Sequence, residues 1–115
     1  MIDDQCLDHE HPATLPRAIV SSAVRQRAAR MLAAAGEPAR LALLELLAEQ
    51  ELCVSELAAC SGDALPAVSQ RLRVLRTEGL VRSRRDGKHV YYALADEHVQ
   101  ALLTNILRHA AEPMG

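Results

Sequence analysis

Residues 66–94, PAVSQRLRVLRTEGLVRSRRDGKHVYYAL, change their hydrophobic period once, near Gly79. Before Gly79, apolar residues recur at the spacing of a helix that runs from about Pro66 to Glu78. The residues expected to face inward are Val68, Leu72 and Leu75. Ser69, Gln70, Arg71 and Arg73 are then left on or near the outer face. Gly79 is a typical helix stop.

After Gly79 the pattern is that of a hairpin. Residues 80–85 alternate weakly, and residues 89–94 are rich in strand-forming types. Between them, Asp86-Gly87 is a strong signal for a two-residue turn. A helix–turn–helix followed by an Arg-rich hairpin is typical of the winged variant of the DNA-binding unit.

Upstream of this stretch the sequence predicts three more helices. A short one covers residues 51–59, with Ser55 as a candidate cap, and residues 61–63 make the turn that follows. Another begins near Pro38 and buries Leu41, Leu44, Leu47 and Ala48. The first covers residues 15–35 and is closed by Gly36. The predicted fold is mainly α with a small β-hairpin (α+β), a winged helix-turn-helix with the hairpin between the fourth and fifth helices.

The fifth helix is predicted over residues 96–112, where an unbroken apolar stripe runs at helical spacing. Its members are Val99, Leu102, Leu103, Ile106, Leu107 and Ala110. His98 and His109 share one face but lie roughly 16 Å apart along the axis, at about 1.5 Å per residue. A zinc ion needs ligands about 2 Å away, so one helix cannot offer both histidines to the same ion.

An antiparallel second copy of the helix removes this difficulty. If residue i faces residue 207 − i of the partner, His98 meets His109 of the other chain, and Asp96 meets Glu112 nearly as well. Asp96 is a plausible N-cap that can turn toward the face of His98. Asp96, His98, His109 and Glu112 then form a four-ligand intersubunit site, built twice per dimer and suited to zinc or cobalt.

Charge is divided unevenly along the chain of 115 residues, which is one domain in size. Residues 71–88 carry seven Arg or Lys and two acidic residues, a net charge of +5, so the remainder carries −7 of the total of −2. A basic block on an acidic protein is typical of a protein that binds a polyanion. No nucleophile–base pairing, Gly-rich phosphate loop or open zinc motif is evident, so we expect neither an enzyme nor a small-molecule substrate.

The sequence also predicts where the protein works. No run approaches 18 apolar residues and no secretion signal is evident, so we expect a cytoplasmic protein without a membrane partner. The cysteines (Cys6, Cys53 and Cys60) are odd in number and scattered, which favours reduced thiols or metal ligands over disulfides. Residues 1–14 are interpreted as a flexible arm that carries Cys6, His9 and His11, and residues 15–112 as the folded domain.

Four motifs occur in order: ELCV at residues 51–54, AVSQRLRVLR at 67–76, DGKHVYY at 86–92, and the ligand set at 96–112. With them the chain resembles the ArsR/SmtB family of dimeric, metal-sensing winged-helix repressors, and especially its zinc-sensing branch. The resemblance implies an apo dimer that binds an imperfect palindrome of double-stranded operator DNA. It also implies that zinc, or cobalt, nickel or cadmium, lowers DNA affinity and derepresses genes for metal efflux or sequestration.

The resemblance also assigns roles to residues. Ser69, Gln70 and Arg71 would approach base edges, Arg73 would reach a phosphate, and Arg84, Arg85 and Lys88 would lie over the DNA backbone or minor groove. A second metal site would combine Cys53 with Cys6, His9 or His11.

Two alternatives stay open on the sequence. One is a repressor of the same fold that senses thiol oxidation, or a thiophilic metal, through Cys6 and Cys53. The other is a metal-buffering protein whose basic block has no sequence preference for DNA.

Overall fold

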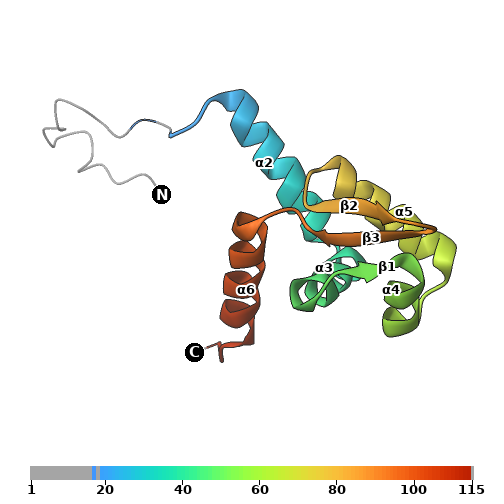
Figure 1. Cartoon of the computed structure of the whole chain (residues 1–115). Coiled ribbons are helices and arrows are strands. Elements are labelled where there is room, and N and C mark those ends of the chain that lie inside the picture. The colour runs from blue at the N-terminus through green and yellow to red at the C-terminus, as the bar shows by residue number, and fades with distance from the viewer. Residues whose placement is uncertain (1–16, 18, 115) are drawn as a thin grey trace, which may run out of the picture.

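The computed structural model describes residue 17 and residues 19–114. Five helices and three strands follow one another along this part of the chain (Figure 1). They are α2 (Ser22–Ala35), α3 (Pro38–Glu49), β1 (Leu52–Cys53), α4 (Val54–Ser61), α5 (Leu65–Thr77), β2 (Val81–Asp86), β3 (His89–Leu94) and α6 (Glu97–Ala111). The predicted class, a mainly helical winged helix-turn-helix with a small sheet, is confirmed.

Local hydrogen bonds from capping side chains set the starts of the first two described helices. Ser21 caps α2 by accepting from the N–H of Val24 at 3.2 Å. Glu37 caps α3 by accepting from the N–H groups of Ala39 and Arg40, both at 3.0 Å, and Pro38 occupies the first turn, where its missing N–H is harmless. The hydrogen bond from Ala39 is the largest cause that lowers the pKa of Glu37 below its ordinary value, and the bond from Arg40 is the second.

Two predicted boundaries are wrong. Helix α2 starts at Ser22, so Ile19 and Val20, which were predicted to be helical, lie outside it, while residues 15, 16 and 18 are outside the described residues. The short helix α4 is capped at Cys53, not Ser55, and the Glu56 carboxylate accepts from the Cys53 N–H at 2.9 Å. A competing short-range hydrogen bond therefore decided each boundary where periodicity alone was ambiguous.

The sheet has three antiparallel strands in the order β1-β3-β2, one more than the predicted hairpin. Leu52 pairs with Tyr92 and Cys53 with Tyr91, which brings the start of α4 against the wing. A strand of two residues is too short to show a hydrophobic period, so periodicity could not reveal it. Asp86 pairs with His89, so the turn residues are Gly87 and Lys88, and Gly87 has a φ of 62° that a side chain would disfavour.

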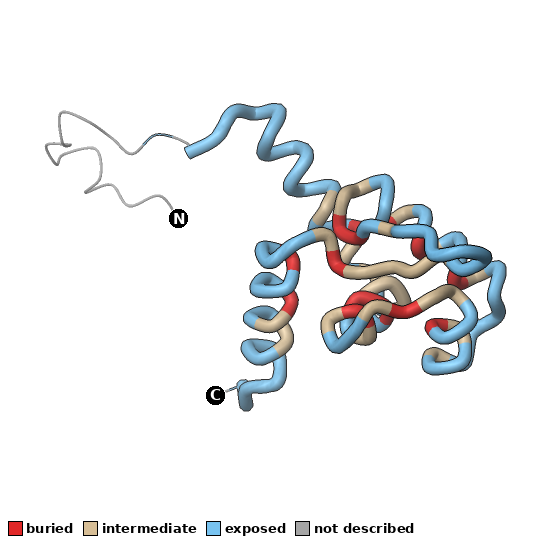
Figure 2. The backbone as a smooth tube through the Cα atoms, viewed as in Figure 1, coloured by how far each residue is buried: buried red, intermediate tan, exposed pale blue. Residues whose placement is uncertain are grey.

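The core lies between α3, α4, α5 and one face of the sheet, and it is aliphatic, as expected from a chain with neither Phe nor Trp (Figure 2). Its largest fully buried side chains are Leu43, Leu44, Leu57, Leu72, Leu75, Leu80 and Val68. The three residues predicted to anchor the fourth helix, Val68, Leu72 and Leu75, are all completely buried. The core therefore fixes α5 against the sheet and leaves its other side to solvent.

Helices α2 and α6 lie at one side of this core, and much of their surface is exposed (Figures 1 and 2). Within α2 only Ala34 is buried, while Val24 and Leu32 are about half exposed. Within α6 the predicted stripe divides: Val99 and Leu103 enter the core, whereas Leu102 and Ile106 remain exposed. Each helix therefore presents an apolar face that its own chain does not cover.

Candidate DNA-binding face and metal half-sites

A carboxylate and an imidazole meet at each end of α6. At its start, Asp96 is the N-cap: its Oδ1 accepts from the Val99 N–H at 3.0 Å, and its Oδ2 lies 3.5 Å from His98 Nδ1. At its end, His109 Nδ1 lies 3.7 Å from Glu112 Oε1. The predicted capping role of Asp96 is thus confirmed, and each helix end holds one nitrogen donor and one oxygen donor.

The two pairs have the spacing of co-ligands. Both distances exceed the roughly 2.7–3.2 Å of a good N–H···O hydrogen bond. Tetrahedral ligands about 2.1 Å from a zinc ion stand about 3.4 Å apart. The His98 side chain is 95% exposed and that of His109 80%, so neither histidine packs in the core. The donor chemistry and spacing fit half of a zinc site at each end.

The Val99 N–H, the largest cause, lowers the pKa of Asp96 below its ordinary value, and the charge of His98 adds to the effect. Asp96 is therefore held as the carboxylate, the form that can bind a metal. Only one of its oxygens is used by the helix cap, which leaves the other directed to His98.

The described part of one chain does not by itself complete a metal site. Among the described residues, no group of three or more His, Cys, Asp or Glu side chains is arranged to hold a metal ion. Within the described residues, Asp96 with His98 and His109 with Glu112 are two separate pairs at opposite ends of one helix.

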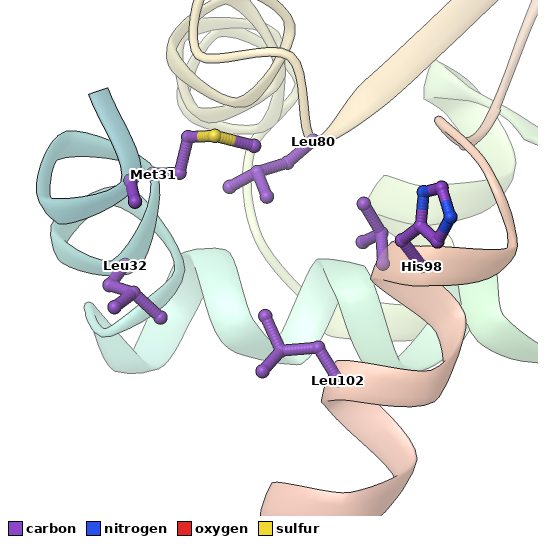
Figure 3. Close-up of a pocket in the computed structure, with 7 residues that line it drawn as sticks. Met31, Leu32, Leu80, His98 and Leu102 are labelled. Atoms are coloured by element: carbon purple, nitrogen blue, oxygen red, sulfur yellow. The ribbon is translucent and has the colours of Figure 1, made fainter. Parts of the chain in front are cut away.

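The histidine face adjoins the uncovered apolar face of α6. At about 100° per residue, His98 and His109 lie within about 20° of each other, and Leu102 is about 20–40° further round the helix. Figure 3 shows His98 at the rim of an apolar hollow of about 240 Å³ between α2 and α6, lined by Met31, Leu32, Leu80 and Leu102 among others. A second hollow of about 190 Å³ continues along α6 as far as Ile106.

The predicted cysteine-containing site is only partly visible. Cys53 is half-buried at the start of α4, and Cys60 is exposed at the other end of that helix. The other predicted ligands of this site, Cys6, His9 and His11, lie outside the described residues. The Glu56 carboxylate next to Cys53 accepts a hydrogen bond from the Cys53 N–H, and this bond, the largest cause, lowers the pKa of Glu56.

Helix α5 displays one continuous polar face. Ser69, Gln70 and Arg73 are exposed, while the opposite side of the helix is buried in the core. Arg71 is turned to the flank, where its Nη1 donates to Asp63 Oδ2 at 3.1 Å, and only 27% of its side chain is exposed. The predicted base-reading residues therefore divide into an open set and one that is already paired.

The wing shows the same division. Arg85 and Lys88 are exposed, and no ion pair holds either of them within the described residues. Arg84 donates two hydrogen bonds to Glu51, from Nε at 2.9 Å and from Nη2 at 2.6 Å. Sequence reasoning missed Glu51 because this contact spans 33 residues and depends on the order of the strands. The exposed helix α5 beside a cationic hairpin defines the class: a winged helix-turn-helix DNA-binding protein.

Comparison with known proteins identifies the family within this class. The model of the bacterial regulatory proteins of the arsR family matches residues 37–83, which run from α3 into β2. A Synechocystis relative, the transcriptional repressor SmtB homolog, is 42% identical over 110 residues, 95% of this chain and 83% of its own length. The chain belongs to the ArsR family of transcriptional regulators, as the sequence motifs had indicated.

Two further comparisons agree. The cadmium resistance transcriptional regulatory protein CadC homolog of Staphylococcus aureus is 34% identical over 73% of this chain and 70% of its own. A solved homodimeric winged helix-turn-helix DNA-binding domain from Mycobacterium bovis, a possible ArsR-family regulator, is 34% identical with a TM-score of 0.75, covering 82% of this chain and 90% of that domain. Within residue 17 and residues 19–114, no helix is both long and apolar enough to cross a membrane.

Proposed function

We propose that this regulator is a metal-responsive repressor that acts as a homodimer in the cytoplasm, where its operator DNA lies. The metal-free dimer binds an imperfect palindrome, and zinc, or cobalt, nickel or cadmium, binds between the subunits and weakens DNA binding. Genes for metal efflux or sequestration are then derepressed.

The observation that carries the proposal is the pair of half-sites on α6. Asp96 and His98 of one chain, with His109 and Glu112 of the other, make an N/O set of four that suits zinc or cobalt. The two distances of 3.5 and 3.7 Å support shared coordination within each pair. A bound metal supplies a cross-link between the two α6 helices.

The uncovered faces of α2 and α6 support the dimer. Contiguous exposed apolar side chains on a small protein mark an interaction surface. Here they are Val24, Leu32, Leu102 and Ile106. An antiparallel α6 pair covers this face and sets His98 opposite His109 of the other chain. The homodimeric state of the similar Mycobacterium bovis domain supports the same assembly.

On the DNA side, the proposal places Ser69 and Gln70 at base edges and Arg73 at a phosphate. On the wing, Arg85 and Lys88 lie over the backbone or minor groove. Arg71 and Arg84 were also predicted to contact DNA. In the structure each is already paired with a carboxylate, Arg71 with Asp63 and Arg84 with Glu51.

The chain offers a short connection between the two functions. Strand β3 of the wing ends at Leu94, two residues before the metal-binding cap Asp96. Ala95 between them donates its N–H to Leu80 at the base of the wing, at 3.0 Å. A shift at the start of α6 is thus transmitted to the wing, and the coupling is reciprocal, so DNA weakens metal binding by the same factor.

The second site stays a prediction. It combines the half-buried Cys53 with Cys6, His9 or His11, and it would add a thiolate ligand near the wing. Thiol sensing through Cys6 and Cys53 is the alternative, and peroxide titration beside zinc titration separates the two.

The test is a titration of DNA binding with metal. The DNA is a duplex that this protein selects from a randomised pool, and binding is followed by fluorescence anisotropy. We expect zinc to release the wild-type protein, and His98→Ala and His109→Ala to bind the duplex normally without responding to zinc. His89→Ala, which removes an exposed histidine outside the site, is the matched control and keeps the response. A His98→Ala protein that still releases DNA on adding zinc contradicts the proposal.

A further inference from the structure

The side chain of Arg84 crosses the wing and ends on the body of the protein. Its guanidinium carbon lies 4.9 Å from the centroid of the Tyr91 ring. Beyond Tyr91, its Nε and Nη2 donate to the two carboxylate oxygens of Glu51 at 2.9 and 2.6 Å. A planar, two-bond contact of this kind fixes both the direction and the position of the guanidinium.

The strand register explains this path. Arg84 pairs with Tyr91 on β3, and Tyr91 pairs with Cys53 on β1, so the three side chains share one face of the sheet. The other face carries Val81, Leu94 and Leu52, which belong to the core. Arg84 therefore lies on the face opposite the core.

Arg85 alternates to the core face, which is the face that α5 packs against. Two adjacent arginines thus point to opposite sides of the wing. Only Arg85 shares a side with the recognition helix.

Glu51 belongs to the body and not to the wing. It stands between the end of α3 at Glu49 and the start of β1 at Leu52. The Arg84 side chain is the largest cause that lowers the pKa of Glu51, and Glu51 is the largest cause that raises the pKa of Arg84. Both groups stay charged together, and Asp86, 3.9 Å from Nη1, adds further negative charge.

We propose that Arg84, held by Glu51 over Tyr91, is a clamp that sets the angle of the wing, and that it is not a phosphate contact. In the clamp, Arg84 is a positioning residue for DNA binding, and Arg85 and Lys88 carry the wing's phosphate contacts. This assignment depends on the proposed DNA-binding role of the wing. It does not depend on metal sensing, so it is tested on metal-free protein in EDTA.

The first readout is the salt dependence of binding to the selected duplex. The slope of log K against log salt is negative, and each lost phosphate contact lowers its magnitude by about 0.9, or by about 1.8 for a dimer. Slopes are compared by their magnitude. We expect Arg85→Ala to lower the slope by about that amount. Arg84→Ala keeps the wild-type slope and weakens binding about two- to fivefold, as expected for loss of a partly exposed ion pair. A lower slope in Arg84→Ala, or unchanged affinity, overturns the proposal.

The second readout is whether substitution of Glu51 weakens or tightens DNA binding. Removing an acidic charge near DNA normally tightens binding. Glu49→Gln serves as that control, because Glu49 is an exposed acidic residue near Glu51 and makes no ion pair within the described residues. Glu51→Gln instead weakens binding about as much as Arg84→Ala, and the double variant is no weaker than either single variant. Tighter binding by Glu51→Gln means that Glu51 restrains a phosphate-binding Arg84, and overturns the proposal.

Folding of each variant is checked by thermal unfolding. Arg84→Lys supplies a second test because it keeps the charge but loses the two-bond geometry. A clamp predicts weaker binding in Arg84→Lys with the slope unchanged. Wild-type affinity in this variant contradicts it.

Discussion

In the α5–wing region, one chain supplies both the packing and the charge partners, whereas α6 keeps an uncovered apolar face and two incomplete pairs of metal-binding groups. Around α5, Val68, Leu72 and Leu75 are fully buried. Arg71 at the flank of α5 and Arg84 on the wing are each paired with a carboxylate of the same chain. Around α6, Leu102 and Ile106 are exposed, and each histidine faces a single carboxylate at 3.5 or 3.7 Å. The DNA-binding face is therefore built within one chain, whereas the proposed metal sites require a second copy of it.

The strongest effect is expected from a substitution that prevents dimerisation through α6. Ile106→Asp places a charge on the uncovered apolar face, where burial in a dimer would leave it unpaired. The chain itself keeps its fold, because Ile106 is half exposed and outside the core. We expect a monomer by analytical ultracentrifugation, with affinity for the selected duplex roughly 100-fold lower or worse, since one of two reading heads is lost.

The matched control is Ala101→Asp, which introduces the same side chain on an exposed position far round the helix from Ile106. It should remain dimeric with near wild-type affinity. If Ile106→Asp stays dimeric as well, α6 does not form the interface.

A weaker effect is expected from a substitution that tests base recognition by α5. Gln70→Ala removes an exposed side chain from the centre of the recognition helix and leaves the core intact. Loss of one good base contact weakens binding by about 10- to 100-fold and relaxes the preference at one position of the operator. Competition with single-base variants of the selected duplex measures this, and the zinc response should persist. An equal loss on all duplexes would show that Gln70 reads no base.

The smallest effect separates the two roles of Asp96. Asp96→Asn keeps an oxygen that can cap α6, whereas Asp96→Ala loses the cap, so only the alanine variant should lower Tm by about a few degrees. Both variants weaken metal binding, because both remove the carboxylate. Thermal unfolding without metal and a zinc titration measure the two roles separately. Equal Tm values for the two variants would show that the cap contributes no stability.

The sequence predicted the features that depend on local geometry. Helical spacing alone showed that His98 and His109 share a face and cannot share an ion within one chain, and their exposure agrees with that. Periodicity, with the glycine stop after α5, located α3, α5 and α6 closely, whereas α2 and α4 begin later than predicted. The start of α2 was missed because apolar residues continue upstream of the Ser21 cap.

Features that depend on tertiary arrangement could not be predicted in this way. Strand β1 is two residues long and exists only because β3 pairs with it. Arg71 and Arg84 belonged to the basic block, yet their partners Asp63 and Glu51 are fixed by packing and strand order. A count of basic residues therefore overstates the number that are free to meet DNA.

In the proposed dimer, each metal site uses the start of α6 from one chain and the end of α6 from the other. Mixing His98→Ala and His109→Ala proteins and measuring tetrahedral cobalt(II) absorption tests this arrangement. Each variant alone has no intact site, but every mixed dimer has one, formed by His98 of one chain and His109 of the other.

We therefore expect no high-affinity cobalt binding by either variant alone. After subunit exchange, we expect on the order of a quarter of the wild-type stoichiometry per chain, because random pairing makes about half of the dimers mixed. If the mixture binds no more cobalt than the separate variants while gel filtration with tagged chains shows that exchange has occurred, the intersubunit site is wrong.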